Sequence, residues 1–179
     1  EGDPETAMQY VNEALFVALS VNDESLQNSA NLVKGLILEA MDDDQSLDLY
    51  EQLLDEAVQE RDLGTNRNVT EAIGRVLNKR GDFQSTLDFK KQALQNSIDV
   101  QDTILQSDLN LEIAELYLSN DQPGEAIPYL NSGLEVSDER GDIEQSLKAS
   151  KTLSDVYAEQ GNYDLALINY EKYVALVDQ

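Results

Sequence analysis

The sequence predicts an all-α fold, an α-α superhelix of antiparallel helix pairs with about nine helices. Three observations predict it. Apolar residues recur three and four positions apart along almost the whole chain, which is the spacing of one helix face. Very short turns rich in Gly, Asn and Asp interrupt this pattern. The pattern also returns at a fixed step of 40 residues, which is typical of a helical repeat protein. Corresponding turns hold Met41, Gly81, Asp121 and Gly161.

The segment 147–179 contains one complete copy of the repeating unit. A first run of apolar residues at helical spacing ends at Tyr157, and a second run ends at Val177. Between the two runs, Gly161 suits the left-handed residue that follows a helix, and Asn162 can cap the next helix. Each unit is therefore expected to consist of two helices joined by a short turn.

We expect a single repeat domain over residues 1–179. It begins with the lone second helix of a truncated repeat, residues 4–22, in which Asp3 is the cap and Pro4 the first helical residue. Pro128 lacks a helical donor, so a kink or a late helix start is expected there. Four helix-pair repeats follow, each with a capping residue at the 40-residue step. The repeats are 23–61, 62–101, 102–141 and 142–179, and the caps are Asn22, Asp62, Asp102 and Asp142.

These units resemble tetratricopeptide repeats, whose pattern is W-x2-L-G-x2-Y, then A-x3-F, then P. The last unit matches best, through Leu153-Ser154, Tyr157, Ala166 and Tyr170. The chain departs from the pattern because it has no Trp, lacks the closing Pro in every unit and repeats after 40 residues instead of the usual 34. Long units of this kind are similar to the variant found in bacterial signalling proteins and adaptor proteins. The other units match through Ile73-Gly74, Leu77 and Ala93, through Ile113-Ala114, Tyr117, Ala126 and Leu130, and most weakly through Val33, Ile37 and Tyr50.

The resemblance implies a right-handed solenoid in which first helices line the concave face and second helices the convex face. It also implies a protein–protein interaction scaffold that binds a peptide or protein segment on the concave face. The alternative is a sensory or regulatory input region of a larger bacterial signalling protein, such as a sensor histidine kinase or a transcription regulator. A purely structural spacer is a third reading.

Composition narrows the function classes. The 179 residues carry a formal net charge of −24, and a surface this acidic repels nucleic-acid phosphates and anionic lipid heads. The absence of Cys and His removes thiolate chemistry and the commonest general base. We therefore expect no enzyme activity, no cofactor and no metal site. No apolar run approaches the roughly 20 residues of a membrane span, so we expect a soluble, cytoplasmic chain, with an extracytoplasmic sensor region as the alternative.

Charge is unevenly distributed, and this suggests a candidate groove. Residues 1–60 and 92–139 are strongly acidic, whereas residues 67–91 carry six bases and three acids. Cations on first helices are expected to hold carboxylates of a partner through charge-assisted hydrogen bonds. The other reading is a solvated face with ordinary i,i+4 ion pairs, Glu71–Arg75 and Glu144–Lys148. No Lys and Asn clamp for a peptide C-terminus is present. The candidate groove residues are Glu71, Arg75, Lys79, Leu111, Glu115, Lys148, Lys151 and Asp155.

Two further patterns are interpreted structurally. The run Asp42-Asp43-Asp44 could attract a divalent cation, but it lacks the Gly-bearing loop and ligand spacing of a calcium site, so we interpret it as a cap and turn. Asn68-Val69-Thr70 matches a glycosylation sequon but opens a helix, which favours a chance match.

The last helix carries a second apolar stripe besides the one that faces its partner. A terminal helix of a repeat array normally has a polar outer face. The stripe therefore predicts either a fragment of a longer repeat protein or self-association through the terminal helices. Scattered apolar surface residues are the alternative. The candidate assembly face is Leu165, Ile168 and Leu176.

Overall fold

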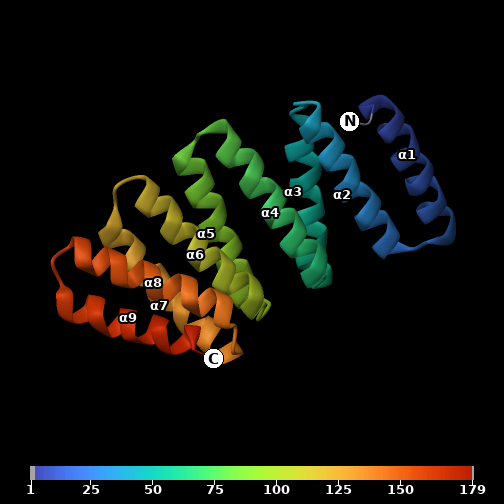
Figure 1. Cartoon of the computed structure of the whole chain (residues 1–179). Coiled ribbons are helices and arrows are strands. Elements are labelled where there is room, and N and C mark those ends of the chain that lie inside the picture. Colours follow the sequence, from blue (N-terminus) through green and yellow to red (C-terminus); the bar gives the residue numbers. More distant parts are fainter. Residues whose placement is uncertain (1–2, 179) are drawn as a thin grey trace. The chain divides into compact units, whose positions relative to one another are not determined.

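The structure is a computed structural model that describes residues 3–178 (Figure 1). Within these residues the chain forms nine α-helices and no strand, which confirms the all-α prediction. The helices alternate with short turns, and within each of the two units described below consecutive helices pack as antiparallel neighbours (Figure 1). They are α1 (Pro4–Val21), α2 (Glu24–Ala40), α3 (Gln45–Glu60), α4 (Leu63–Arg80), α5 (Phe83–Asp99), α6 (Thr103–Ser119), α7 (Pro123–Arg140), α8 (Ile143–Glu159) and α9 (Tyr163–Val177).

The helices form two compact units. Unit 1 ends at Asp82 and contains α1–α4, and unit 2 begins at Phe83 and contains α5–α9. The boundary falls at the turn between α4 and α5, inside the predicted repeat 62–101. The single repeat domain and its four pairs stay a prediction.

Unit 1 buries its core between the second helix α3 and the first helices α2 and α4. Tyr50 and Leu53 of α3 and Ile73 of α4 are almost completely buried. Gly35 of α2 lies directly under the Tyr50 ring, where an added Cβ would come within 2.3 Å of Cε1. The absence of a side chain at Gly35 therefore sets how closely α2 and α3 approach.

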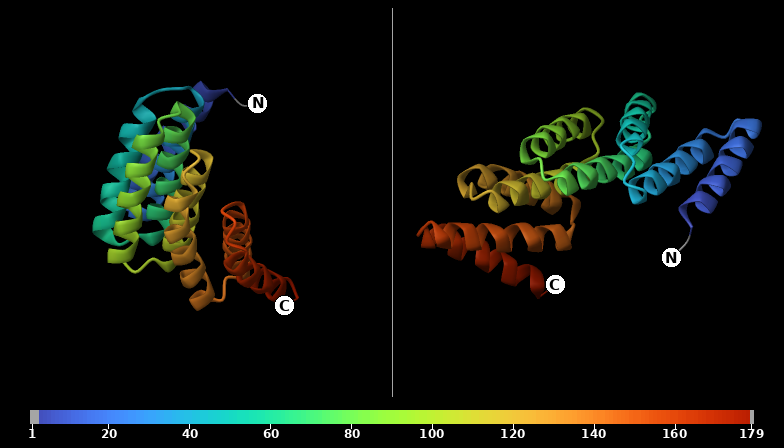
Figure 2. Two further views of the ribbon diagram at one scale, coloured as in Figure 1. Left: turned by 90° about the vertical axis from the view of Figure 1, so that its left-hand side faces the viewer. Right: turned by 90° about the horizontal axis from the view of Figure 1, so that it is seen from above.

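Unit 2 repeats this arrangement over five consecutive helices, and its last pair, α8 and α9, runs side by side and antiparallel (Figure 2). Ile113 and Ala114 of α6, Leu130 of α7 and Leu153 of α8 form one buried cluster. On α9, Ala166 is the buried residue among those described.

Aspartate caps begin the first helices, and three of the four predicted caps are correct. The carboxylates of Asp62, Asp102 and Asp142 each accept a hydrogen bond from the backbone N–H three residues later. The predicted cap Asn22 is wrong, because Asn22 has a φ of 52° and ends α1 in the left-handed conformation. Asp23 caps α2 instead, accepting from the Leu26 N–H at 3.0 Å.

The left-handed turn residues define the true repeat length. Between paired helices they are Asp42, Gly81, Asp121 and Gly161, so the first step is 39 residues and the next two are 40. The predicted turn residue Met41 lies in the right-handed region, with a φ of −85°. The segment containing α3 is one residue shorter than its counterparts, which is why alignment at a uniform step of 40 misplaces both Met41 and Asn22.

Helix α7 begins at Pro123 and continues through Pro128, so the predicted late start is wrong. Pro123 occupies the first helical position, where its missing N–H has no intrahelical partner. Pro128 removes the donor that would reach the carbonyl of Gly124. Pro128 and Gly124 are both exposed, so water can satisfy the Gly124 carbonyl and the helix continues.

Candidate functional site

In unit 1, three basic side chains in the second half of α4 pair with carboxylates of α2 and of the turn that follows it. The Arg75 guanidinium donates from Nε to Glu39 Oε1 at 2.9 Å and from Nη2 to Glu39 Oε2 at 3.0 Å. The Tyr50 hydroxyl also donates to Glu39 Oε2, at 3.3 Å. Glu71 lies one turn before Arg75, with its Oε1 3.6 Å from Nη1. One carboxylate, Glu39, therefore links two first helices and the buried ring of the second helix.

This network shifts the pKa of its members in directions that follow from its geometry. Hydrogen bonds from Arg75 hold the pKa of Glu39 below its usual range, although partial burial opposes this. The same bonds raise the pKa of Arg75. Burial, together with the negative charge of Glu39, raises the pKa of Tyr50 to about 12. The ion pair and the neutral phenol are thus mutually stabilised at neutral pH.

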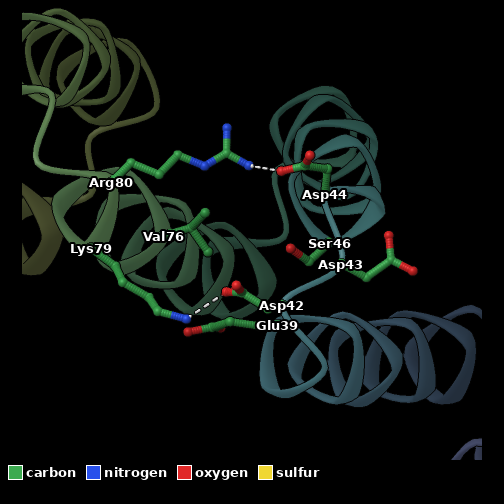
Figure 3. A pocket seen from close by; sticks show the side chains of 8 residues that line it. All are labelled: Glu39, Asp42, Asp43, Asp44, Ser46, Val76, Lys79 and Arg80. Atoms are coloured by element: carbon green, nitrogen blue, oxygen red, sulfur yellow. Dashed lines mark hydrogen bonds and ion pairs between the residues drawn. The ribbon is translucent and has the colours of Figure 1, made fainter.

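Two of the three aspartates after α2, Asp42 and Asp44, contact the end of the same helix α4 (Figure 3). Lys79 pairs with Asp42 at 2.7 Å, and Arg80 pairs with Asp44 at 2.6 Å. Asp43 accepts from the Gln45 backbone N–H at 2.9 Å, at the start of α3. In the part of the chain that the structure describes, no group of three or more Asp, Glu, His or Cys side chains is arranged to hold a metal. Two ion pairs therefore hold the turn against α4. An open cavity of about 380 Å³ lies between these side chains.

In unit 2, the predicted groove cations are also paired. Lys148 of α8 reaches Glu115 of α6 at 2.7 Å, and Lys151 pairs with Asp155 one turn later at 2.8 Å. Glu71–Arg75 thus forms as the expected i,i+4 pair, whereas Lys148 pairs across to the preceding first helix and not with Glu144. The side chains of the two pairs Lys148–Glu115 and Lys151–Asp155 are about half exposed.

Leu111 does not belong to the exposed surface, contrary to the prediction. Its side chain is 2% exposed, and its Cδ2 would lie 2.8 Å from a Cβ added to Gly133 of α7. Helix α6 packs against α5, α7 and α8, so its buried residues surround most of the helix. A single buried stripe cannot be read from such a sequence, and this explains why Leu111 was assigned to the groove.

An aromatic recess at the start of unit 2 has no counterpart among the predicted sites. The Lys91 ammonium donates to the Tyr117 hydroxyl at 2.8 Å, and this bond raises the pKa of Lys91. The Tyr117 ring meets Phe83 edge-on, with centroids 6.3 Å apart, and stacks on Tyr129 at 5.8 Å. The adjacent open cavity has a volume of about 690 Å³. Apolar spacing marks Phe83 and Tyr117 only as core residues, so no sequence signal separates this recess from ordinary packing.

The predicted assembly face lies on α9 but is not uniform. Ile168 is 59% exposed and Leu165 is 37% exposed, whereas Leu176 is half-buried. Tyr163, Leu167 and Val177 of α9 are also more than half exposed. At helical spacing they lie on a different side of the helix from Leu165 and Ile168. No helix among the described residues is long and apolar enough to cross a membrane.

Comparison with known proteins gives relatives named as repeat proteins and docking subunits. No family model matches the chain. It is 22% identical over 171 residues to tetratricopeptide repeat protein 29 of Trypanosoma brucei brucei, covering 92% of this chain and 36% of the relative. It is 28% identical over 179 residues to outer dynein arm-docking complex subunit 4 of Homo sapiens, covering 96% of this chain and 26% of the relative. The chain therefore spans about a third or less of the length of these curated relatives.

Solved structures share the fold at low sequence identity. BtubC from P. vanneervenii superposes with a TM-score of 0.71 at 14% identity, covering 98% of this chain and 74% of that one. A Podosopora anserina kinesin light chain with nearly identical TPR-like repeats gives 0.63 at 14% identity, covering 97% and 86%. A Rap protein complexed with Competence and Sporulation Factor gives 0.66 at 16% identity, covering 96% and 48%. The chain thus has a tetratricopeptide-like helical-repeat fold.

Proposed function

We propose that the chain binds a peptide or protein segment across the exposed surface of its first helices, the face that the resemblance assigns to the concave side. The observation that carries this proposal is that ion pairs join successive first helices in each unit. Arg75–Glu39 joins α4 to α2, and Lys148–Glu115 joins α8 to α6. Within each unit, such a pair presents charged groups on a surface that is already formed.

A partner carboxylate can be accommodated by these cations at little energetic cost. Exposed ion pairs contribute only about 0–1 kcal/mol, so Lys148 can exchange or share Glu115 with a partner. Arg75 uses two of its five donors on Glu39, and its side chain is 43% exposed. Because the surface needs little ordering before it binds, less of the interaction free energy is lost on association. The preferred partner segment carries Asp or Glu.

The similar proteins support a protein partner. One relative is named as a docking complex subunit, and one similar structure is a complex with a factor. The chain spans only part of those proteins, 26% and 48% of their lengths.

The experiment is a peptide-display selection against the chain, followed by titration of each selected peptide against two matched variants. Lys148→Glu breaks a pair between first helices, and Lys172→Glu breaks the equivalent pair to Asp138 between second helices α9 and α7. We expect Lys148→Glu to weaken binding on the order of tenfold, and Lys172→Glu to change it less than about twofold. Equal effects of the two variants, or a selection that yields no binder, would overturn the proposal.

A regulatory input role is the second candidate, and the likeness to the Rap complex supports it. Its test is the longer coding sequence. A kinase or DNA-binding domain in the same polypeptide would favour this role, and a polypeptide containing only helical repeats would count against it.

A further inference from the structure

The aromatic recess of unit 2 is lined by residues of the three consecutive helices α5, α6 and α7. On α5 these residues are Phe83, Leu87 and Lys91, which are four positions apart and therefore lie on one side of the helix. Helix α6 contributes Tyr117, and the first turn of α7 contributes Gly124. None of the lining residues lies near either end of the described chain, so the recess is formed by the packing of the unit itself.

Lys91 differs from the neighbouring Lys90 in the kind of group that it contacts. Lys90 forms an ion pair with Glu112, at 2.5 Å. Lys91 instead donates to the Tyr117 hydroxyl at 2.8 Å, and its ammonium nitrogen lies 5.3 Å from the centre of the Tyr117 ring. Asp88, one turn before Lys91 on α5, accepts from a glutamine amide at 2.8 Å. Among the described residues, the positive charge of the recess therefore contacts a neutral phenol and not a carboxylate.

This cation is particular to α5. Because the repeat step in unit 2 is 40 residues, Lys91 corresponds to Asn131 of α7 and to Glu171 of α9. The Asn131 side chain donates to a backbone carbonyl of its own helix at 2.9 Å. The helical repeat therefore does not require a cation at this position, which separates Lys91 from the residues that the repeat needs for packing.

The ammonium and the phenol can together hold a carboxylate. An ammonium group has three N–H donors, and Tyr117 takes one of those of Lys91. The Tyr117 hydroxyl accepts that bond and keeps its own O–H as a donor. Lys91 is half-buried, so water and salt screen its charge less than that of an exposed side chain. The half-buried Phe83 ring, which meets Tyr117 edge-on, adds an apolar wall.

We propose that the aromatic recess binds a segment of a partner protein through the side-chain carboxylate of an Asp or Glu and a nearby apolar side chain. The carboxylate accepts hydrogen bonds from Lys91 and Tyr117, and the apolar side chain packs on Phe83. Asp121 and Glu125 also line the recess, and because both are exposed they are well screened. They still disfavour an anion with about two charges, such as a phosphate group. The recess is open, so the partner chain can continue on both sides of the bound residue.

The test titrates short peptides into the isotopically labelled chain and follows its backbone amide signals by nuclear magnetic resonance. The first peptide is acetyl-Ala-Phe-Ala-Glu-Ala-amide, whose Phe and Glu face the same side when it is extended. Three matched peptides replace Glu by Gln, Glu by Lys, or Phe by Ala. We expect the Glu peptide to shift the signals of residues 83–91 and 121–125. It should bind at least about fivefold more tightly than each matched peptide, because these lose the charge-assisted hydrogen bonds or the apolar contact.

Variants of the chain locate the binding. Lys91→Met removes the charge and keeps the length of the side chain, so the Glu and Gln peptides should then bind alike. Lys172→Met removes an equal charge from α9 and should leave the preference for Glu intact. An added Cβ at Gly124 meets no atom within 4 Å, so Gly124→Leu fills the recess without a clash. It should weaken the Glu peptide about tenfold, and far-ultraviolet circular dichroism checks that each variant is folded.

The proposal is overturned if the native chain binds the Glu and Gln peptides equally or the Lys peptide more tightly. A preference for Glu that survives Lys91→Met would also exclude it. A further peptide, acetyl-Ala-Phe with a free C-terminal carboxylate, tests the other source of the same group, and its binding in place of the Glu peptide would count against a side-chain carboxylate. Lys148→Glu, which tests the proposed function, should leave the Glu peptide unaffected. Lys91→Met should likewise leave peptides that respond to Lys148→Glu unaffected, so the two proposals can fail separately.

Discussion

Arg75 of α4 contacts both carboxylate oxygens of Glu39 of α2, which lies 36 residues earlier in the chain. The Tyr50 hydroxyl completes the set of donors around Glu39. The Glu39 side chain is only 18% exposed, whereas Glu71, the other carboxylate beside Arg75, is 74% exposed. The two acids therefore differ in how much they contribute to the stability of unit 1.

Replacing Glu39 by Gln should lower the free energy of unfolding by about 1 kcal/mol, because charge-assisted hydrogen bonds to a partly buried carboxylate are lost. The matched change Glu71→Gln should alter it by less than about 0.5 kcal/mol, as for other exposed pairs. Urea denaturation followed by circular dichroism measures both. A larger loss for Glu71→Gln would contradict the assignment of Glu39 as the structural acid.

The stabilisation by Glu39 should depend on pH. Its pKa is lower in the folded chain than the ordinary value of 4.5, so its contribution is complete above that ordinary value and is lost as the pH falls through the folded pKa. The difference in unfolding free energy between the native chain and Glu39→Gln should therefore shrink on acidification. A difference that is constant between neutral and strongly acidic pH would exclude this linkage.

Tyr50 should titrate at higher pH than a solvent-exposed tyrosine. Its pKa is raised from 10.0 to about 12, so the stabilisation from the neutral phenol is complete below the ordinary value and is lost as the pH rises through about 12. Ultraviolet absorbance titration of the native chain and Tyr50→Phe gives the Tyr50 curve by difference. Ionisation of that tyrosine near its ordinary value would contradict the buried hydrogen bond to Glu39.

Gly35→Ala should destabilise unit 1 by roughly 1–3 kcal/mol, because its methyl group would overlap the fully buried Tyr50 ring. The control is Gly124→Ala in the first turn of α7, where an added Cβ meets no atom within 4 Å. That change should be neutral or stabilising by up to about 1 kcal/mol, since alanine favours the helix. The melting temperature should therefore fall for Gly35→Ala and stay unchanged or rise for Gly124→Ala.

Asp23→Ala should lower stability by about 1 kcal/mol through loss of the cap on the Leu26 N–H, whereas Asp23→Asn should preserve the cap. Asn22→Gly should be neutral or stabilising, because glycine adopts the left-handed conformation without strain. Denaturant midpoints for the three variants decide which residue caps α2. A larger loss for Asn22→Gly than for Asp23→Ala would restore the original prediction.

Much of the fold could be predicted because its determinants are local. Apolar residues three and four apart predict the helices, and Asp62, Asp102 and Asp142 each cap a helix through a hydrogen bond to the third residue on. The ion pair Glu71–Arg75 follows from the same short spacing. The uniform step of 40 misaligns the first repeat because one residue is missing from the α3 segment. Apolar spacing still fits a helix after a shift of one residue, whereas the left-handed turn residues fix the position.

The candidate sites depend on contacts between helices, and these were predicted less well. Lys148 could pair with Glu144 on its own helix or with Glu115 on α6, and only the packing of α6 beside α8 selects Glu115. Leu111 and Leu167 both fit an apolar stripe, yet Leu111 is buried and Leu167 is exposed, because α6 packs against α5, α7 and α8, whereas among the described helices α9 packs chiefly against α8. Sequence by itself determined where most of the helices begin and end, since hydrogen bonds within a few residues control this; the exceptions are the first repeat, which lacks one residue, and the start of α7. Tertiary structure alone decided which side of each helix faces a neighbour, because that depends on the rotation of each helix about its axis when residues more than 30 positions apart pack together.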